Sequence, residues 1–574
     1  MSTLTVVPGP AAAVSGEPDL WCSYAAVRTL RWLDRIEPRP AGSGSGPVPD
    51  LDGTAAYLAR HRNSDGGYAW SRGMTSDAWA TFYATQALRD LGRPVPAPER
   101  TARWLESTWS GEAYAMMPGQ RPDVWATHFS TRTAVEVCRT GVSDEARLLA
   151  WLGALQTPDG GLTWSPEHTE PDVRACYYGI AAWRAVRPAG PAPWDVPALV
   201  RWLQDSQHPS GGFRFNAASE VPCLWATYRA AGALAMLGAR PRHDPSAFVD
   251  SLRGPGGGYV RWPGYTVEDV WAAFCAVGAL RAVGASTSGI ADAVAARVAT
   301  FACPGGGFTY REPEAAADVL AGAAAVLSGL AEPAEVTPWL AACQLPNEGG
   351  VMYMPGRGSE VRCTTWALAA GAFADDEPGR ARIAAWLRAI QNPDGGFGYW
   401  EGRGSDLVST AAAVAAVALL GRRLESTVDT HRLARFVQSC ATGDGYATVP
   451  GATPTLRAGA QALRIRAALH DPDSAALADL LERHRVPGGG FANEGNRVPD
   501  LLSTYEAVLA ADTYHLPVDT AAIGRFLDRV TTGAETAWTP LGPPTGGALA
   551  HCLATLLRAR LTDPTRKLPP LTLS

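Results

Sequence analysis

A glycine-rich turn motif recurs along almost the whole chain, and internal repetition of this kind constrains a fold more than any other sequence feature. Each copy joins a Gly-Gly pair to one or two aromatic or apolar residues. The copies are SDGGYAW (64–70), PDGGLTW (158–164), PSGGFRF (209–215), PGGGYVRW (255–262), PGGGFTY (304–310), NEGGVMY (347–353), PGGGFAN (487–493) and a weaker GDGYATV (443–449).

One complete unit, residues 382–421, shows what the turn separates. Ile383, Trp386, Leu387 and Ile390 lie at helical spacing, which predicts an amphipathic helix. The Asn-Pro-Asp-Gly-Gly cluster then ends that helix. A second helix is predicted from Asp406, an N-capping residue, and it is apolar almost all round, as a helix surrounded by other helices is.

Segments that resemble this second helix recur, so the chain is predicted to contain twelve of them, each with an amphipathic partner. Their starts at residues 77, 123 and 172 are 46 and 49 residues apart, as two helices and their turns require. The other copies start near residues 19, 222, 269, 318, 360, 406, 456, 500 and 545. Because the second helices have no solvated face, a closed ring suits them better than a linear solenoid. The predicted fold is all-α, with two α/α barrels built from about twelve helix pairs.

Composition narrows the classes of function. The net charge of −6 gives no basic surplus for nucleic-acid binding, and no apolar run is long enough to span a membrane. The ten cysteines form no CxxC pair and mostly lie in alanine-rich apolar stretches, which favours reduced thiols and a cytoplasmic protein. The N-terminus lacks the pattern of a signal peptide.

The turn motif resembles the repeat of a known superfamily. Its fullest copies, a Q-x-x-D-G-G-type element at 156–164 and 391–399, are similar to those of class II terpene cyclases and squalene–hopene cyclases, and to the Gly-Gly-Phe repeat of protein prenyltransferase β subunits. The resemblance implies a βγ double barrel. On that pattern residues 1–50 contain an N-terminal segment and the first inner helix of the β barrel. A Gly/Pro/Ser linker (38–50) leads to a γ-like barrel at 51–332, and 333–574 completes the β-like barrel.

The resemblance also implies cyclisation of an isoprenoid started by protonation. The family places a D-x-D-D-T-A-type acid motif at the start of the eighth inner helix by our count, where this chain reads SEVRCTTWAL (359–368). Glu360 replaces the first Asp, Arg362 replaces the proton donor, and Cys363 replaces its neighbour. Because arginine stays charged, Arg362 cannot supply the proton. The candidate catalytic residues are therefore Glu360, Asp406, Asp318 and Cys363. Asp318 takes the motif's first place if the helix count is shifted by one. The alternative role for the three acids is helix capping.

Two further sets of residues are candidates for substrate binding. Arg357, Arg362 and Arg403 are predicted to gather at one barrel mouth, near helix N-termini, where they would favour a diphosphate. Their alternative is pairing with Glu360 and Asp406 as loop residues. Aromatic side chains on the inner helices of the second, β-like barrel are predicted to line an isoprenoid pocket or, alternatively, to be plain core: Trp21, Tyr24, Trp366 and Tyr505.

We therefore expect an atypical class II-like terpene cyclase, of the isomerase or lyase class, that acts on a prenyl diphosphate or a polyene. Isoprenoid transfer and non-catalytic isoprenoid binding remain the alternatives. A prenyltransferase-type zinc site is not expected, because Val361 and Ser503 stand where its Asp and His ligands would lie. Protonation needs no cofactor, although a diphosphate substrate would bring Mg²⁺. The expected partner is a small isoprenoid, with peripheral membrane contact possible and the oligomeric state left open.

Overall fold

The computed structural model describes residues 16–36, 48–70, 74–217, 219–533, 535–543 and 546–573, so most of the predicted linker lies outside the described residues. Its regular secondary structure is almost all helical, with two short hairpins. The helices with the most buried residues are Leu20–Trp32 (α2), Ala78–Asp90 (α4), Val124–Arg132 (α6), Val173–Val186 (α8), Leu224–Met236 (α10), Val270–Ala282 (α12), Val319–Leu327 (α14), Val361–Ala369 (α16), Leu407–Leu419 (α18), Leu456–Ala468 (α20), Leu501–Thr513 (α22) and Gly547–Thr562 (α24).

The remaining elements lie between these helices along the chain. The amphipathic helices are Leu51–Arg60 (α3), Pro98–Ser107 (α5), Glu145–Gly153 (α7), Val196–Asp205 (α9), Ser246–Ser251 (α11), Ser288–Ala299 (α13), Pro333–Ala342 (α15), Glu377–Ala389 (α17), Thr430–Ser439 (α19), Ser474–His484 (α21) and Thr520–Val530 (α23). The short elements are a π turn at Thr133–Cys138 (η1), 3₁₀ turns at Pro313–Ala315 (η2) and Leu424–Ser426 (η3), and two hairpins, Ala441–Thr442 (β1) with Gly445–Tyr446 (β2) and Thr531–Thr532 (β3) with Glu535–Thr536 (β4).

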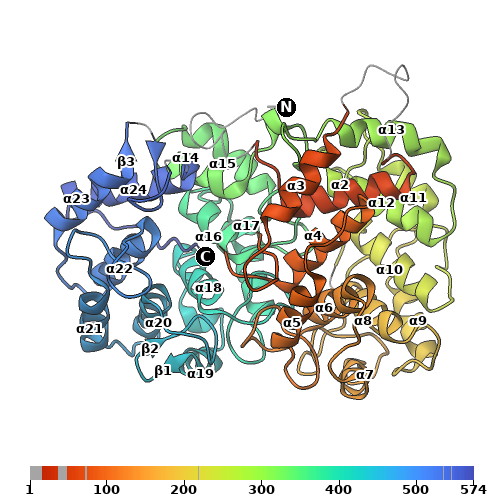
Figure 1. Ribbon diagram of the computed structural model, residues 1–574, viewed down its shortest axis with the longest axis horizontal. Coiled ribbons are helices and arrows are strands. Elements are labelled where there is room, and N and C mark those ends of the chain that lie inside the picture. Colours follow the sequence, from red (N-terminus) through yellow and green to blue (C-terminus); the bar gives the residue numbers. More distant parts are fainter. Residues whose placement is uncertain are drawn as a thin grey trace.

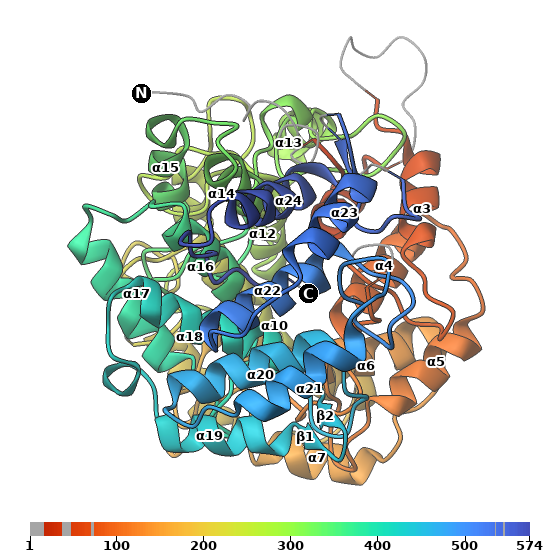
Figure 2. The ribbon, with the colours of Figure 1, turned by 90° about the vertical axis from the view of Figure 1, so that its left-hand side faces the viewer.

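The even-numbered helices close two separate rings. In the first ring α2, α4, α6, α8, α10 and α12 pack in chain order, and α12 packs back on α2. In the second ring the order is α14, α16, α18, α20, α22 and α24, and α24 packs back on α14. Figure 1 shows the two barrels side by side, and Figure 2 looks along the axis of the second. The prediction of two α/α barrels with twelve inner helices is confirmed.

The predicted domain boundaries are wrong. The first inner helix, α2, belongs to the first barrel rather than to the second, because Trp32 stacks on Phe274 of α12 at 4.9 Å and Tyr24 stacks on Tyr83 of α4 at 4.2 Å. The core of the first barrel contains residues from Leu20 to Ala316, together with Met354 and Trp400, and the core of the second begins at Val319 of α14. Each barrel therefore closes with helices that are consecutive in the sequence.

Capping residues and glycine turns explain why the same unit forms repeatedly. Asp406, like most residues at the starts of inner helices, is extended and accepts a hydrogen bond from the amide three residues on, here Ser409 at 2.7 Å. The turn before it contains Gly395, whose φ of +95° suits glycine and whose Cα faces the backbone of Arg432. A Cβ at Gly395 would lie 2.1 Å from the Arg432 carbonyl carbon.

The second barrel is filled by the C-terminal segment of its own chain, residues 563–573. Its inner helices carry many alanines, and the space at the axis takes up the buried side chains of Leu568, Leu571 and Leu573. Trp366 donates from Nε1 to the Thr572 carbonyl at 3.1 Å, and Tyr505 donates from its hydroxyl to the Pro569 carbonyl at 2.7 Å. In Figure 2 the C-terminus lies inside this ring. None of the helices in the described part of the chain is both long and apolar enough to cross a membrane.

Candidate functional site

The first barrel contains a layer of tryptophans at one end of its inner ring. Five of its six inner helices place a tryptophan two residues after the residue that caps them: Trp21, Trp79, Trp125, Trp225 and Trp271. The sixth helix, α8, has arginine at that position. Because the helices begin at the same level, equal spacing from the cap brings these side chains together. All five tryptophans are 1–3% exposed.

The indole rings contact one another around the barrel. Trp21 lies 4.7 Å from both Trp79 and Trp271, and Trp79 lies 4.7 Å from Trp125, measured between ring centroids. The indole nitrogens of Trp21, Trp125, Trp225 and Trp271 are buried and have no hydrogen-bond partner in the described part of the chain. Buried donors of this kind usually have an acceptor, so these four N–H groups are available to donate hydrogen bonds to a ligand.

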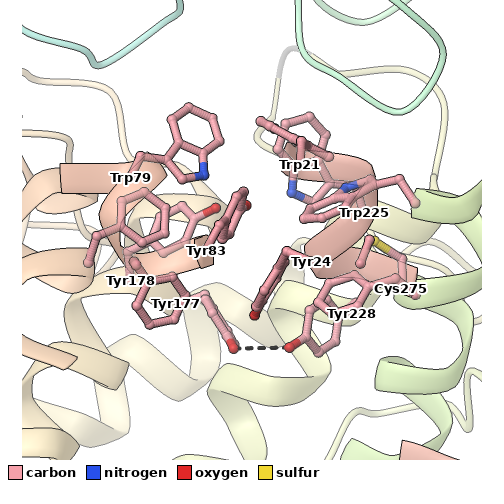
Figure 3. Close-up of a cluster of buried hydrophobic side chains, with 14 of the residues drawn as sticks. Trp21, Tyr24, Trp79, Tyr83, Tyr177, Tyr178, Trp225, Tyr228 and Cys275 are labelled. Carbon is pink, nitrogen blue, oxygen red and sulfur yellow. Dashed lines mark hydrogen bonds between the residues drawn. The ribbon is translucent and has the colours of Figure 1, made fainter. Parts of the chain in front are cut away.

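A second aromatic layer lies about one helical turn deeper, five or six residues after each cap. It consists of Tyr24, Phe82, Tyr83, His128, Phe129, Tyr177, Tyr178, Tyr228 and Phe274. Figure 3 labels the five tyrosines of this layer, with Trp21, Trp79 and Trp225 above them. At the base of the view the hydroxyls of Tyr177 and Tyr228 are hydrogen-bonded at 3.1 Å. The interior of the first barrel is thus lined by π faces over two layers.

Loops of the second barrel cover the tryptophan end of the first. Trp400 inserts its ring 4.3 Å from Trp79, and the Arg403 guanidinium donates to Asp77 at 2.5 Å with both side chains 3% exposed. Arg357 donates to Asp19, and its guanidinium lies over the Trp21 ring at 5.2 Å. This end of the first barrel is therefore closed by residues of the neighbouring barrel and shielded from solvent.

Two capping aspartates at this end have raised pKa values. Burial raises the pKa of Asp123 to about 7, against the lowering effects of the Ala126 amide and the Arg403 charge. Burial also raises the pKa of Asp269 to about 6. In each carboxyl one oxygen accepts an amide hydrogen bond at 2.8 Å, and Oδ2 has no partner in the described residues. A carboxyl that retains its proton near neutral pH can donate it from the unbonded oxygen.

Arg174 takes the place of the sixth tryptophan and joins the two barrels. Its guanidinium is 3% exposed and pairs with Asp172 at 2.9 Å, with Glu348 at 2.8 Å and with Glu401 at 2.7 Å. It also lies 5.6 Å from the centre of the Trp225 ring. A guanidinium held by three carboxylates is fully engaged, so Arg174 fixes the contact between the barrels.

The predicted acid motif at the start of α16 is internally paired. Glu360 Oε1 accepts from Arg362 at 2.6 Å, and Oε2 accepts from the Cys363 thiol at 2.9 Å. Burial, followed by the Glu360 charge, raises the pKa of Cys363 well above its usual range, so this thiol is protonated. Asp406 receives both the Ser409 amide and its hydroxyl. Asp406 therefore caps α18, whereas the Glu360 side chain makes no capping hydrogen bond and pairs with Arg362 and Cys363 instead.

Asp318 and the three predicted arginines also have partners within the protein. Asp318 caps α14 through the Ala321 amide at 2.7 Å, and burial raises its pKa to about 6. Each of the three predicted arginines has a carboxylate. Arg357 and Arg403 pair across the barrels with Asp19 and Asp77, whereas Arg362 pairs with Glu360 of its own helix start.

The predicted aromatic pocket does not form as one site. Trp21 and Tyr24 line the first barrel, whereas Trp366 and Tyr505 lie in the second and hold the C-terminal segment. The two pairs are separated because α2 belongs to the first ring. No three His, Cys, Asp or Glu side chains of the described ranges converge as metal ligands do.

Sequence reasoning missed the residues that make the first barrel distinctive, although a signal for some of them was present. A tryptophan two residues after the helix start recurs in DLW, DAW, DVW, PCLW and DVW, all before residue 272. In the second half of the chain the same position is held by Leu320, Arg362, Val408, Arg457, Leu502 and Ala548. The burial that raises the pKa of Asp123 depends on residues from the other barrel and has no sequence signal.

Comparison with known families agrees with this architecture. The model described as "Prenyltransferase alpha-alpha toroid domain" matches residues 8–108, 74–190, 193–359, 359–508 and 456–535, nearly the whole chain. The chain belongs to this family. None of the curated proteins compared with this toroid protein matches it.

Three solved structures show how far the likeness extends. The toroid protein is 16% identical to ent-copalyl diphosphate synthase from Streptomyces platensis, with 95% of this chain and 98% of that chain covered and a TM-score of 0.42. It is 14% identical to Candida albicans protein geranylgeranyltransferase-I complexed with GGPP (45% and 87% covered, TM-score 0.35). It is 17% identical to the type II terpene cyclase MstE from Scytonema (63% and 97% covered, TM-score 0.17). Likeness at this level carries no conclusion about activity.

Proposed function

We propose that this toroid protein binds an isoprenoid chain in the aromatic interior of the first barrel and cyclises it by protonation. This moves the site expected from the sequence from the start of α16 to the start of α6. The observation that carries the proposal is Asp123, a buried carboxyl with a pKa raised to about 7 and an unbonded Oδ2, set directly above a tryptophan layer.

Asp123 has the properties of a proton donor to an alkene. Because burial raises its pKa to about 7, about half of the Asp123 carboxyls retain the proton at neutral pH. Once the proton leaves, the Ala126 amide at 2.8 Å, the N-terminus of α6 and the Arg403 charge stabilise the carboxylate that remains. These groups favour the product of proton transfer more than the reactant, which is what catalysis requires. Asp269 has the same arrangement on α12 and is the second candidate donor.

The rest of the barrel suits a carbocation. Protonation of a double bond leaves a positive charge on carbon, and the faces of indole and phenol rings stabilise a nearby cation by about 0.5–2 kcal/mol each. Burial of both layers keeps water, which would trap the cation, away from it. His128, 2% exposed with its pKa lowered well below the usual range, is neutral, and its Nδ1 has no partner in the described chain. It is the candidate base that removes a proton at the end of the reaction.

Product analysis with matched acid variants tests this assignment. Purified protein is incubated with farnesyl, geranylgeranyl and squalene-type substrates, and extracts with and without phosphatase are analysed by mass spectrometry. Asp123→Asn keeps a good capping residue and removes the acid, so cyclic product falls at least about a hundredfold. Glu360→Gln, the matched change in the second barrel, leaves product formation within about twofold.

The same assay separates the alternatives. Loss of product in Glu360→Gln but not in Asp123→Asn would contradict the proposal and restore the acid site expected from the sequence. Saturable binding without any turnover would favour a non-catalytic isoprenoid-binding protein. Products in which the prenyl group is joined to a second molecule would favour a transferase.

A further inference from the structure

Arg229 carries a positive charge inside the first barrel. It lies on α10, one turn deeper than Trp225, and it is 4% exposed. Its guanidinium lies over three tyrosine rings, 4.5 Å from the centre of Tyr177, 5.2 Å from Tyr178 and 4.6 Å from Tyr228. It donates one hydrogen bond, at 3.3 Å, to the hydroxyl of Tyr178. The charge is therefore placed among the aromatic rings that Figure 3 shows.

This guanidinium has no carboxylate partner in the part of the chain that the structure describes. Arg28, Arg132 and Arg174, on α2, α6 and α8 of the same ring, each pair with at least one carboxylate. The Nε of Arg229 is buried and has no acceptor among the described residues. Burying a charge without a counterion is costly, so an anion from outside the protein would be strongly favoured here.

The surroundings limit what that anion is. One planar guanidinium matches one carboxylate, which it binds through two parallel hydrogen bonds. A diphosphate carries several negative charges, and another guanidinium of this ring, that of Arg132 on α6, is already paired with Glu136 at 2.6 Å. The aromatic walls on every side suit a hydrocarbon body.

We propose that the first barrel is a binding site for an apolar molecule with a single carboxylate, whose hydrocarbon lies among the tryptophan and tyrosine rings and whose carboxylate pairs with Arg229. This rests on the proposed function, because it names the class of substrate for the same site. A carboxylate at Arg229 would also make the proposed cyclisation more favourable. An unpaired guanidinium would repel a carbocation formed one or two turns away, whereas a carboxylate neutralises it.

Binding measurements with three ligands that share one chain test this proposal. A C15 isoprenoid acid, the corresponding alcohol and the corresponding diphosphate are titrated into the protein at pH 8 by calorimetry. We expect the acid to bind at least about tenfold more tightly than the alcohol, as a charge-assisted hydrogen-bonded pair implies. Arg229→Met removes that preference and leaves the alcohol within about twofold of wild type, and Arg229→Lys retains part of it.

Arg184→Met is the matched control. Arg184 lies on α8 and has no carboxylate within ion-pair distance in the described residues, but its guanidinium lies over the Trp183 ring at 4.2 Å and donates to the Met236 carbonyl at 2.8 Å, outside the two aromatic layers. We expect its acid-to-alcohol ratio to equal that of wild type. Circular dichroism checks that each variant is folded.

Three results would overturn the proposal: equal binding of acid and alcohol by wild type, tightest binding of the diphosphate, or equal weakening of all ligands in Arg229→Met. Its failure is distinguishable from failure of the cyclase. Asp123-dependent cyclisation without a preference for the acid would leave the proposed function standing. A preference for the acid without turnover would leave this binding site standing.

Discussion

Because the pKa of Asp123 is raised, replacing its carboxyl by a neutral amide is predicted to increase the free energy of unfolding at high pH. The unfolded chain releases this proton near the ordinary value of 3.8, whereas the folded chain holds it to about 7. Folding therefore takes up a proton between these two pH values, so stability falls as pH rises through that window, and the loss is complete above about pH 7. The gap between the two values corresponds to about 4 kcal/mol, an upper limit. Asn caps a helix as well as Asp does, so Asp123→Asn removes the loss without removing the cap.

We expect the free energy of unfolding of Asp123→Asn to exceed that of wild type by up to about 4 kcal/mol at pH 8, with the difference vanishing near pH 4. Urea denaturation at several pH values measures it, with tryptophan fluorescence as the signal, since most of the 20 tryptophans lie in the first barrel. The matched control is Asp195→Asn, which changes an exposed cap whose carboxyl accepts the Ala198 amide at 2.9 Å. Equal stability of Asp123→Asn and wild type at pH 8, or a difference that does not change with pH, would refute the reasoning.

Three further predictions concern packing and exposure. Leu571→Ala leaves a cavity in the second barrel and lowers its unfolding free energy by about 2–5 kcal/mol in urea titration, and a loss under about 1 kcal/mol would show that the C-terminal segment does not fill the barrel. Gly402→Ala lowers the melting temperature, because a Cβ at Gly402 would lie 2.3 Å from Trp164 of the other barrel. Gly421→Ala is the control and has a smaller effect, because Gly421 also has a positive φ but has open space around it. Equal losses of melting temperature in the two variants would contradict the contact between the barrels. Of the ten thiols, Cys138 alone is not fully buried, so it reacts first with a maleimide, and earlier labelling of another cysteine in mass spectra would contradict the burial.

The architecture was predictable because short local sequence patterns determine each helix pair and recur along the chain. The capping aspartates and glycine turns set each helix pair, and the apolar second helices required a ring, so the two barrels followed from pattern alone. The division between barrels did not follow. Assigning α2 to the second barrel came from a family pattern, whereas ring closure is decided by packing such as that of Trp32 on Phe274.

The site could be predicted only in part. Glu360 looked like an acid because of its position along the chain, but its partners Arg362 and Cys363 are visible only in three dimensions. Conversely, Asp123 looks like any other cap in the sequence. Its raised pKa comes from burial beneath loops almost 280 residues away in the chain, near Arg403. Burial of a residue in one barrel by loops of the other leaves no pattern in the sequence around that residue.

The most direct test of protonation as the initiating step is the reaction in D₂O. If an acid of the protein starts the cyclisation, its exchanged deuteron is transferred to carbon, and the cyclic product gains one deuterium at the carbon that was protonated. Mass spectrometry and deuterium NMR of the product locate that atom, and Asp123→Asn lowers formation of the deuterated product at least about a hundredfold. A cyclic product that carries no deuterium, or deuterated product formed at the wild-type rate by Asp123→Asn, would contradict the account.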